Sequence, residues 1–250
     1  MRRKKYVLSK KKKINSKVIN WIKRILILLF ALGASFYTIT VVFIQSYTIN
    51  TQAMNPTFTE NETVLASPLS YGIQLLPETS RILRFSDPVP GDVVISVPGN
   101  FPETGIFTYA LEGIVRFFTF QKISLFHNLY PAYFNQLQIK RVIAGPGETV
   151  YMEDFVFYIQ DSPGMEFISE FERSPRPYRT QHPALPENWS ADLPVSGDLP
   201  PVQLGENEYF LASDNRTANQ DSRNYGAVAI DRIRSKVVLV YWPASSIRTP

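Results

Sequence analysis

The feature that most constrains this chain is a run of twenty uncharged, mostly apolar residues near its N-terminus, "ILILLFALGASFYTITVVFI", Ile25–Ile44. At about 1.5 Å per residue, a helix of this length spans a hydrocarbon core of about 30 Å. A buried core helix would normally keep a polar stripe, and a cleaved signal peptide would have a shorter apolar region followed by a small-residue cleavage site. We therefore predict a transmembrane helix and assign residues 25–45 to the membrane.

The charge of the chain is concentrated before this run. Residues 1–24 contain 11 of the 26 Lys and Arg residues and no acidic residue, so the remainder has 15 basic against 22 acidic residues, a balance of −7. The positive-inside rule then places the basic arm 1–24 in the cytoplasm and residues 46–250 outside the cell membrane. Because the positive charge belongs to a terminal arm, we expect contact with the lipid bilayer and no nucleic-acid partner.

The residue types that hold metals are scarce in this chain. It contains no cysteine and only two histidines, His127 and His182, which lie far apart and outside any H-E-x-x-H pattern. A disulfide framework, a thiolate nucleophile and a zinc protease site are therefore not expected. We predict no metal and no cofactor.

Short runs rich in β-branched and aromatic residues alternate with turn signals after residue 46. Pro-Gly pairs at 90–91 and 146–147 each precede an acidic residue and a Val-containing stretch. This pattern predicts a mainly β, antiparallel domain rather than alternating βαβ units. The runs are "ETVLAS", "PVPGDVVISV", "QIKRVIAGPGETVYM", "FVFYIQ", "NEYFLAS", "GAVAI" and "SKVVLVYWP".

Two stretches, about 105–135 and 160–204, do not fit the β pattern and are interpreted as insertions. In residues 105–126 the apolar positions have helical spacing, which favours a short amphipathic helix packed on the β domain. The alternative is that its phenylalanines lie in the membrane interface. The second stretch contains 8 of the 19 prolines and is predicted to be an extended surface segment.

Lys140 is a candidate for chemistry because it lies among strand-forming residues in "QLQIKRVIAGPG". Its alternative is an ordinary solvated strand residue. If its amine is instead buried among apolar groups, its pKa falls and it can act as a general base near neutral pH.

A second polar cluster is "SDNRTANQDSRNYG", Ser213–Gly226, between two predicted strands. Its acidic and basic residues alternate within ten positions. They can form exposed ion pairs of little energetic value, or a polar scaffold that fixes a neighbouring catalytic group.

Together these segments resemble one family, the type I signal peptidases, which are membrane-anchored serine endopeptidases with a Ser/Lys dyad. The resemblance covers "QAMNPTF", "VPGDVVIS", "IKRVIAGPGETV" and "SDNRTANQDSRNYG" in the family's order, behind an N-terminal anchor. It implies a signal-peptidase-like catalytic domain that takes the signal peptides of secretory precursor proteins and needs no cofactor. The sequence carries no indication of the oligomeric state.

The resemblance also assigns individual positions. Met54, Pro56 and Thr57 match the turn that presents the nucleophile, and the nucleophile position itself is occupied by Ala53. Lys140 matches the general base, and Thr51 matches the residue whose hydroxyl completes the oxyanion hole. The remaining matches are Arg141 beside the base and, in the last motif, Asp214, Asn215, Arg216, Asp221, Ser222 and Arg223.

Three positions depart from the family pattern: Ala53, Ser213 and Asn219. Ser213 replaces the usual glycine, and Asn219 replaces the serine that orients the lysine. An asparagine can still accept a hydrogen bond from that lysine. Ala53, in contrast, has no oxygen with which to attack a carbonyl, so the resemblance implies a hydrolase that is inactive as written.

Other readings stay open at this point. Thr51 could attack instead, but on an extended segment it would lie about 7 Å from position 53, too far for Lys140 to serve both. Ala53 is either a natural loss or a deliberate substitution, and the additional change at Asn219 favours natural loss. The chain could also be a non-catalytic pseudopeptidase that captures precursors or partners an active signal peptidase.

Overall fold

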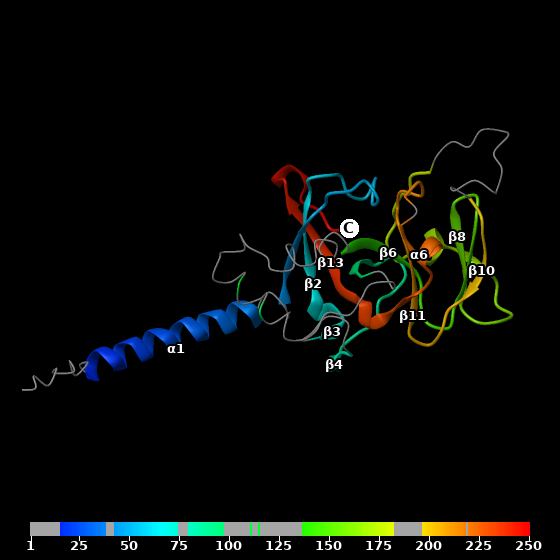
Figure 1. The fold of residues 1–250 in the computed structure, drawn as a ribbon. Helices are drawn as coiled ribbons and strands as arrows, with labels where there is room; N and C mark the ends of the chain where they lie inside the picture. The colour runs from blue at the N-terminus through cyan, green and yellow to red at the C-terminus, as the bar shows by residue number, and fades with distance from the viewer. Residues whose placement is uncertain are drawn as a thin grey trace, which may run out of the picture.

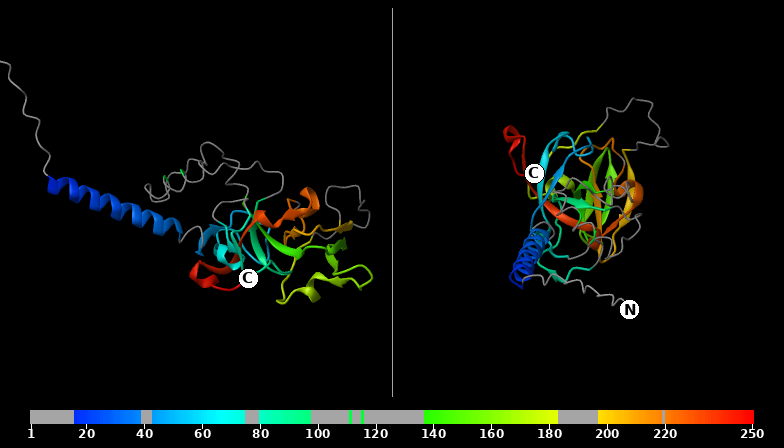
Figure 2. Two further views of the ribbon diagram at one scale, coloured as in Figure 1. Left: turned by 90° about the horizontal axis from the view of Figure 1, so that it is seen from below. Right: turned by 60° about the vertical axis from the view of Figure 1, so that its left-hand side comes forward.

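The computed structural model describes residues 16–38, 43–74, 80–97, 111, 115, 137–182, 197–218 and 220–250. An N-terminal helix projects away from a β-rich part, as Figures 1 and 2 show. The expected helix in 105–126 lies outside these residues except for Leu111 and Val115, and so do His127 and Asn219.

The N-terminal helix α1 spans Ser16–Thr38 and therefore begins before the predicted start at Ile25. Lys and Arg are good helix formers, so the helix extends back through Lys17, Lys23 and Arg24 into the basic arm. Within α1, Lys17–Phe36 is long and apolar enough to cross a membrane, and none of it is buried against the rest of the protein. Residues 39–42, within the predicted span, lie outside the described part.

The largest sheet has seven strands in the order β1-β2-β13-β5-β6-β11-β12, and every pair of neighbours is antiparallel. The long strand β13 lies between β2 and β5, so a strand near the end of the chain joins β1 and β2 to the rest of the sheet. The strands are β1 Gln45–Thr48, β2 Thr63–Ser67, β5 Val93–Ser96, β6 Gln138–Ala144, β11 Glu208–Ala212, β12 Val228–Ala229 and β13 Ile233–Trp242.

Two smaller antiparallel sheets complete the β-rich part. The four-stranded sheet has the order β10-β7-β8-β9, and a second sheet pairs β3 with β4. All runs predicted as strands from the sequence contain observed strands. The strands here are β3 Gly72–Ile73, β4 Leu83–Arg84, β7 Thr149–Glu153, β8 Val156–Gln160, β9 Ile168–Ser169 and β10 Leu199–Gln203.

Most described residues of 160–204 are exposed or partly exposed, as predicted, but the segment is not simply extended. β9 and β10 belong to the four-stranded sheet, and between them the helix α5, Glu170–Arg173, contains a buried carboxylate, Glu170. Ser169 and Glu172 form a capping box at the start of α5. The S-x-x-E spacing of that box is a helix-start signal that the sequence already carries.

Apolar side chains fill three clusters around these sheets. The first joins β2, β5 and β13 to Met54 and Phe58 of the preceding turn. The second lies between β6 and β11 of the large sheet and the strands β7 and β8 of the four-stranded sheet, and includes Phe157 and Phe210. The third covers the region of β11, β12 and the start of β13. The antiparallel β-rich fold with one apolar N-terminal helix is therefore confirmed.

Candidate active site

The turn that carries Ala53 is anchored in the core by two of its own apolar side chains. Within it, the N–H of Asn55 donates to the carbonyl of Gln52 at 3.1 Å, and the N–H of Phe58 donates to the carbonyl of Met54 at 2.9 Å. Met54 and Phe58 are buried in the first apolar cluster, whereas Pro56 is exposed and its bond to Asn55 is cis. The turn therefore has its apolar side chains in the core and its backbone near the surface.

Residue 53 lies at the edge of this turn and is partly buried. Its carbonyl accepts a hydrogen bond of 3.0 Å from the N–H of Asn215, and the Asn215 side chain donates to the carbonyl of Gln52 at 3.2 Å. Thr51 is exposed and forms part of a bend. Because 51 and 53 do not lie on a strand, the extended spacing considered for Thr51 does not apply.

Lys140 lies in β6 and is buried, with 2% of its surface exposed. Its Nζ donates to Oγ of Ser213 at 2.7 Å. Burial lowers the pKa of Lys140 to about 8, although Asp221 and Asp214 oppose the shift and Arg223 adds to it. The alternative of a solvated strand lysine is therefore wrong.

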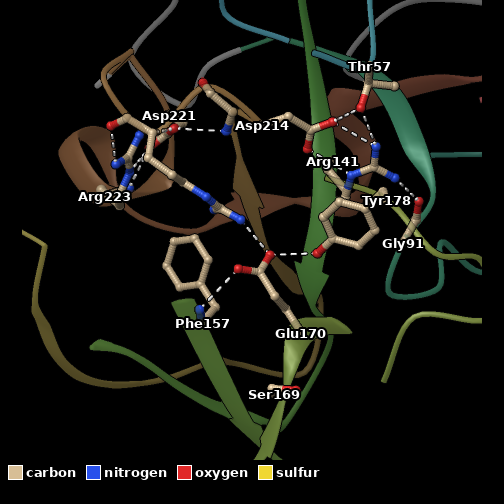
Figure 3. Close-up of polar contacts among 12 residues, drawn as sticks. Thr57, Gly91, Arg141, Phe157, Ser169, Glu170, Tyr178, Asp214, Asp221 and Arg223 are labelled. Atoms are coloured by element: carbon tan, nitrogen blue, oxygen red, sulfur yellow. Dashed lines mark hydrogen bonds and ion pairs between the residues drawn. The ribbon is translucent and has the colours of Figure 1, made fainter. Parts of the chain in front are cut away.

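The neighbouring Arg141 holds Asp214 with both ends of its guanidinium. Nε donates to Oδ1 at 2.8 Å and Nη2 donates to Oδ2 at 2.7 Å, with Nη1 on the carbonyl of Gly91. The hydroxyl of Thr57 also donates to Asp214, and it accepts from Arg141 at 3.2 Å. Figure 3 shows this arrangement, which ties the turn, strand β6 and the 213–216 loop together.

A second buried ion pair joins Arg216 to Glu170 of α5. The side chains of both residues are essentially inaccessible, with exposed fractions of 0% and 1%. Glu170 also accepts hydrogen bonds from the hydroxyl of Tyr178 and, at 3.1 Å, from the N–H of Phe157 (Figure 3). A carboxylate with this many donors is stable in the interior.

The last part of the polar motif is held by Asp221. Its carboxylate accepts from the N–H of Ser213 at 2.9 Å and from Arg223, and it also caps the short helix α6, Ser222–Tyr225. The Ser222 hydroxyl accepts from the N–H of Leu211. Asp214, Arg216 and Asp221 are at most 1% exposed, so the alternative of exposed surface ion pairs is wrong.

The structure thus brings most of the sequence-predicted site residues to one place. Ala53, Lys140 and Arg141 all contact the loop Ser213–Asn215, through a backbone carbonyl, an amine and a guanidinium. Asp221 holds the same loop through the N–H of Ser213, and Arg223 donates to Asp221 and to the carbonyl of Arg216. Ser222 contacts the adjoining strand β11 through Leu211. Asn219 lies outside the described residues, and within the described ranges no group of His, Cys, Asp and Glu side chains is arranged to hold a metal.

Sequence reasoning missed four contributors. In the sequence Ser213 is only a departure from the family pattern, and Glu170 and Tyr178 lie in the segment predicted to be at the surface. Arg248 donates to the carbonyl of Thr57 at 2.6 Å and to both oxygens of Glu62, so it braces the turn from the C-terminal side. For Arg248 no signal in the sequence pointed to the turn.

Comparison with known proteins identifies the family of the chain. A family model described as signal peptidase, peptidase S26, matches residues 18–242. The chain belongs to the signal peptidase family. The resemblance seen in the motifs is confirmed, and the apolar helix α1 together with this family indicates a membrane-anchored protein.

Individual relatives in the signal peptidase family cover the chain to different extents. Signal peptidase I T of Bacillus subtilis (strain 168) is 34% identical over 111 residues, which are 44% of this chain and 51% of the relative. Over that match the chain spans about half the length of the relative. Signal peptidase I P of Bacillus subtilis subsp. natto is 24% identical over 243 residues, 97% of this chain and 98% of the relative. A crystal structure of a signal peptidase I from Enterococcus faecalis V583 is similar with 18% identity and a TM-score of 0.32, covering 62% of this chain and 99% of that one.

Proposed function

We propose that this member of the signal peptidase family binds the signal-peptide region of exported precursors but does not cleave it at a useful rate. The observation that carries the proposal is that the buried Lys140 and a turn with alanine at residue 53 both contact the loop Ser213–Asn215. Burial moves the pKa of Lys140 toward neutral pH, as a general base requires, while the attacking oxygen is missing. The predicted orientation, with the N-terminal arm in the cytoplasm, places this site outside the membrane.

In a Ser/Lys dyad the serine oxygen attacks the scissile carbonyl while the lysine amine accepts its proton, and the lysine later returns that proton to the leaving amine. A lysine with a pKa of about 8 has a substantial neutral fraction near pH 7 to 8 and can accept a proton. Ala53 keeps its backbone N–H, so one oxyanion donor is retained, and Thr51 is the proposed second donor. Loss of the nucleophile from such a unit lowers the rate by about 10⁶-fold.

Strand β6 offers an edge on which an extended peptide can add. β11 pairs with β6 from Arg141 to Ala144, so Gln138, Ile139 and Lys140 extend beyond the last β11 partner. Within the described strands, this end of β6 has a partner only on its β5 side. Backbone hydrogen bonding along such an edge supplies affinity, and pockets for alternate side chains supply specificity.

A second candidate function is that of an accessory protein that uses the same edge of β6 to capture precursors or to partner an active signal peptidase. The retained Arg141–Asp214 clamp and the lowered pKa of Lys140 favour an intact catalytic scaffold over a decayed groove. The two functions differ in what happens when a hydroxyl is returned to residue 53.

The deciding experiment is cleavage of a labelled precursor by the full-length chain in detergent, with product masses read directly. The chain as written, Ala53→Ser, and Ala53→Ser with Lys140→Met are compared. We expect cleavage after a small residue only with Ala53→Ser alone. If Ala53→Ser remains silent while precursor binding is retained, the accessory function is supported; if the unmodified chain cleaves, the proposal is wrong and another hydroxyl makes the attack.

A further inference from the structure

We propose that Ser213 orients Lys140, the role that the family resemblance assigns to position 219. The inference rests on the proposed function for its catalytic meaning, but the contact itself does not. Oγ of Ser213 lies 2.7 Å from Nζ of Lys140, and both residues are buried, with 0% and 2% of their surfaces exposed. In the part of the chain that the structure describes, Ser213 is the side chain that hydrogen-bonds to this amine.

The backbone of Ser213 is held on both sides, so its hydroxyl position is set before a substrate arrives. Its N–H donates to Asp221, the preceding Ala212 pairs with Arg141 across β11 and β6, and the following Asp214 is clamped by Arg141. Lys140 and Arg141 are adjacent on β6, and their partners Ser213 and Asp214 are adjacent in the loop. The position of the loop along β6 is therefore the same for both contacts. The loop therefore cannot shift away from the lysine without breaking a buried ion pair.

A hydroxyl suits the lysine in both of its protonation states. It accepts a hydrogen bond from the ammonium, and it can rotate to donate to the neutral amine. The charged groups that face the amine are Asp221 and Arg223 at α6 and Asp214 in the loop, and they act through space. Ser213 is itself fully buried, so it positions the base and is not placed to attack a substrate.

The first test measures the titration of Lys140 in the full chain as it exists, with alanine at residue 53. Isotope-labelled lysine is followed by NMR in detergent micelles, and the Lys140 signal is assigned with Lys140→Arg. We expect Ser213→Ala to lower the pKa of Lys140 by about one to two units, because the ammonium loses its hydrogen bond. Ser213→Gly, which carries the residue usual in the family, is expected to do the same.

Ser235→Ala is the matched control, since Ser235 is also fully buried and its hydroxyl has no hydrogen-bond partner among the described residues. It should leave the titration unchanged. Asn219→Ala tests the competing assignment. The proposal is overturned if Asn219→Ala shifts the pKa of Lys140 more than Ser213→Ala does, or if neither Ser213 variant shifts it.

The second test uses the Ala53→Ser chain, in which Ser213→Ala should lower kcat at least tenfold with little change in KM. If Ala53→Ser does not cleave but Ser213 still controls the titration of Lys140, the proposed function fails and the positioning role stands. If Ala53→Ser cleaves and Ser213→Ala alters neither kcat nor the titration, the positioning role fails and the proposed function stands.

Discussion

The ring of Tyr178 lies 3.8 Å from the guanidinium carbon of Arg141. Tyr178 comes from the proline-rich segment, whereas Arg141 comes from the strand that carries the candidate base. The ring covers one face of the guanidinium that clamps Asp214, and its hydroxyl reaches Glu170. The segment 168–182 therefore helps to shield the Arg141–Asp214 ion pair from solvent.

Removal of charge from Glu170 should destabilise the fold strongly. Glu170→Gln leaves the buried guanidinium of Arg216 without a counter-ion, a change that costs about 3–5 kcal/mol when a buried pair is broken. The measurement is denaturant unfolding of the full chain in detergent. Asp87→Asn, in the exposed Arg84–Asp87 pair, is the control and should change stability by less than about 1 kcal/mol. Equal effects of the two substitutions would contradict the buried role.

The geometry of Arg141 should matter beyond its charge. Lysine cannot make the bidentate contact to Asp214 and also reach Gly91, so Arg141→Lys leaves buried acceptors without donors. We expect a loss of about 1–3 kcal/mol in unfolding free energy. In the Ala53→Ser chain the same substitution should reduce cleavage, since Thr57 and the turn depend on this clamp. A variant as stable and active as its parent would show that charge alone is sufficient.

The buried lysine should make stability depend on pH. Its pKa is about 8 in the folded chain against 10.5 for the ordinary group, so between these values the unfolded chain binds more protons and stability rises with pH. Lys140→Met removes the cost of burying the charge, which amounts to about 3 kcal/mol. The stabilisation by Lys140→Met should therefore be greatest below pH 8 and shrink toward pH 10.5, as read from melting temperatures across that range. A gain that is independent of pH would indicate packing instead.

Cleavage by Ala53→Ser should follow the titration of the same group. Only the neutral amine accepts a proton, so kcat/KM should be low at acid pH, rise through an apparent pKa of about 8, and level off above it. Ser213→Ala, introduced into this chain, should move the rise to lower pH. A profile that rises near pH 6 to 7 in the parent would point to a different base.

Much of the fold could be predicted from local pattern. β-branched runs between turn signals gave the positions of β2, β5, β6, β8 and β13, because strands with buried faces need such residues at short range. The helix α1 begins before the predicted membrane span, because apolar length marks only the part that suits a membrane, whereas the helix continues through Lys23 and Arg24.

The motifs of the site could be predicted from the sequence, but the hydrogen bonds and ion pairs between distant segments could not. Lys140, Arg141 and Asp214 were found because their spacing matches a family. The partnership of Glu170 with Arg216, or of Lys140 with Ser213, depends on which loops meet in space, and charged residues carry no periodicity that reports it. The exposure predicted for 160–204 holds for most of its described residues, but the prolines gave no sign that Glu170 enters the interior.

The position of β13 between β2 and β5 determines when the large sheet can be completed during synthesis. β2 pairs with β13 between Ser67 and Lys236, positions 236 − 67 = 169 residues apart, so β2 waits roughly 10–30 s for its neighbour at ribosomal speeds of about 5–20 residues per second. During that interval Val64 and Ala66, which are fully buried in the finished sheet, have no β13 to cover them. The turn that carries Ala53 packs on the same strands, so it can reach its final conformation only after β13 has been synthesised.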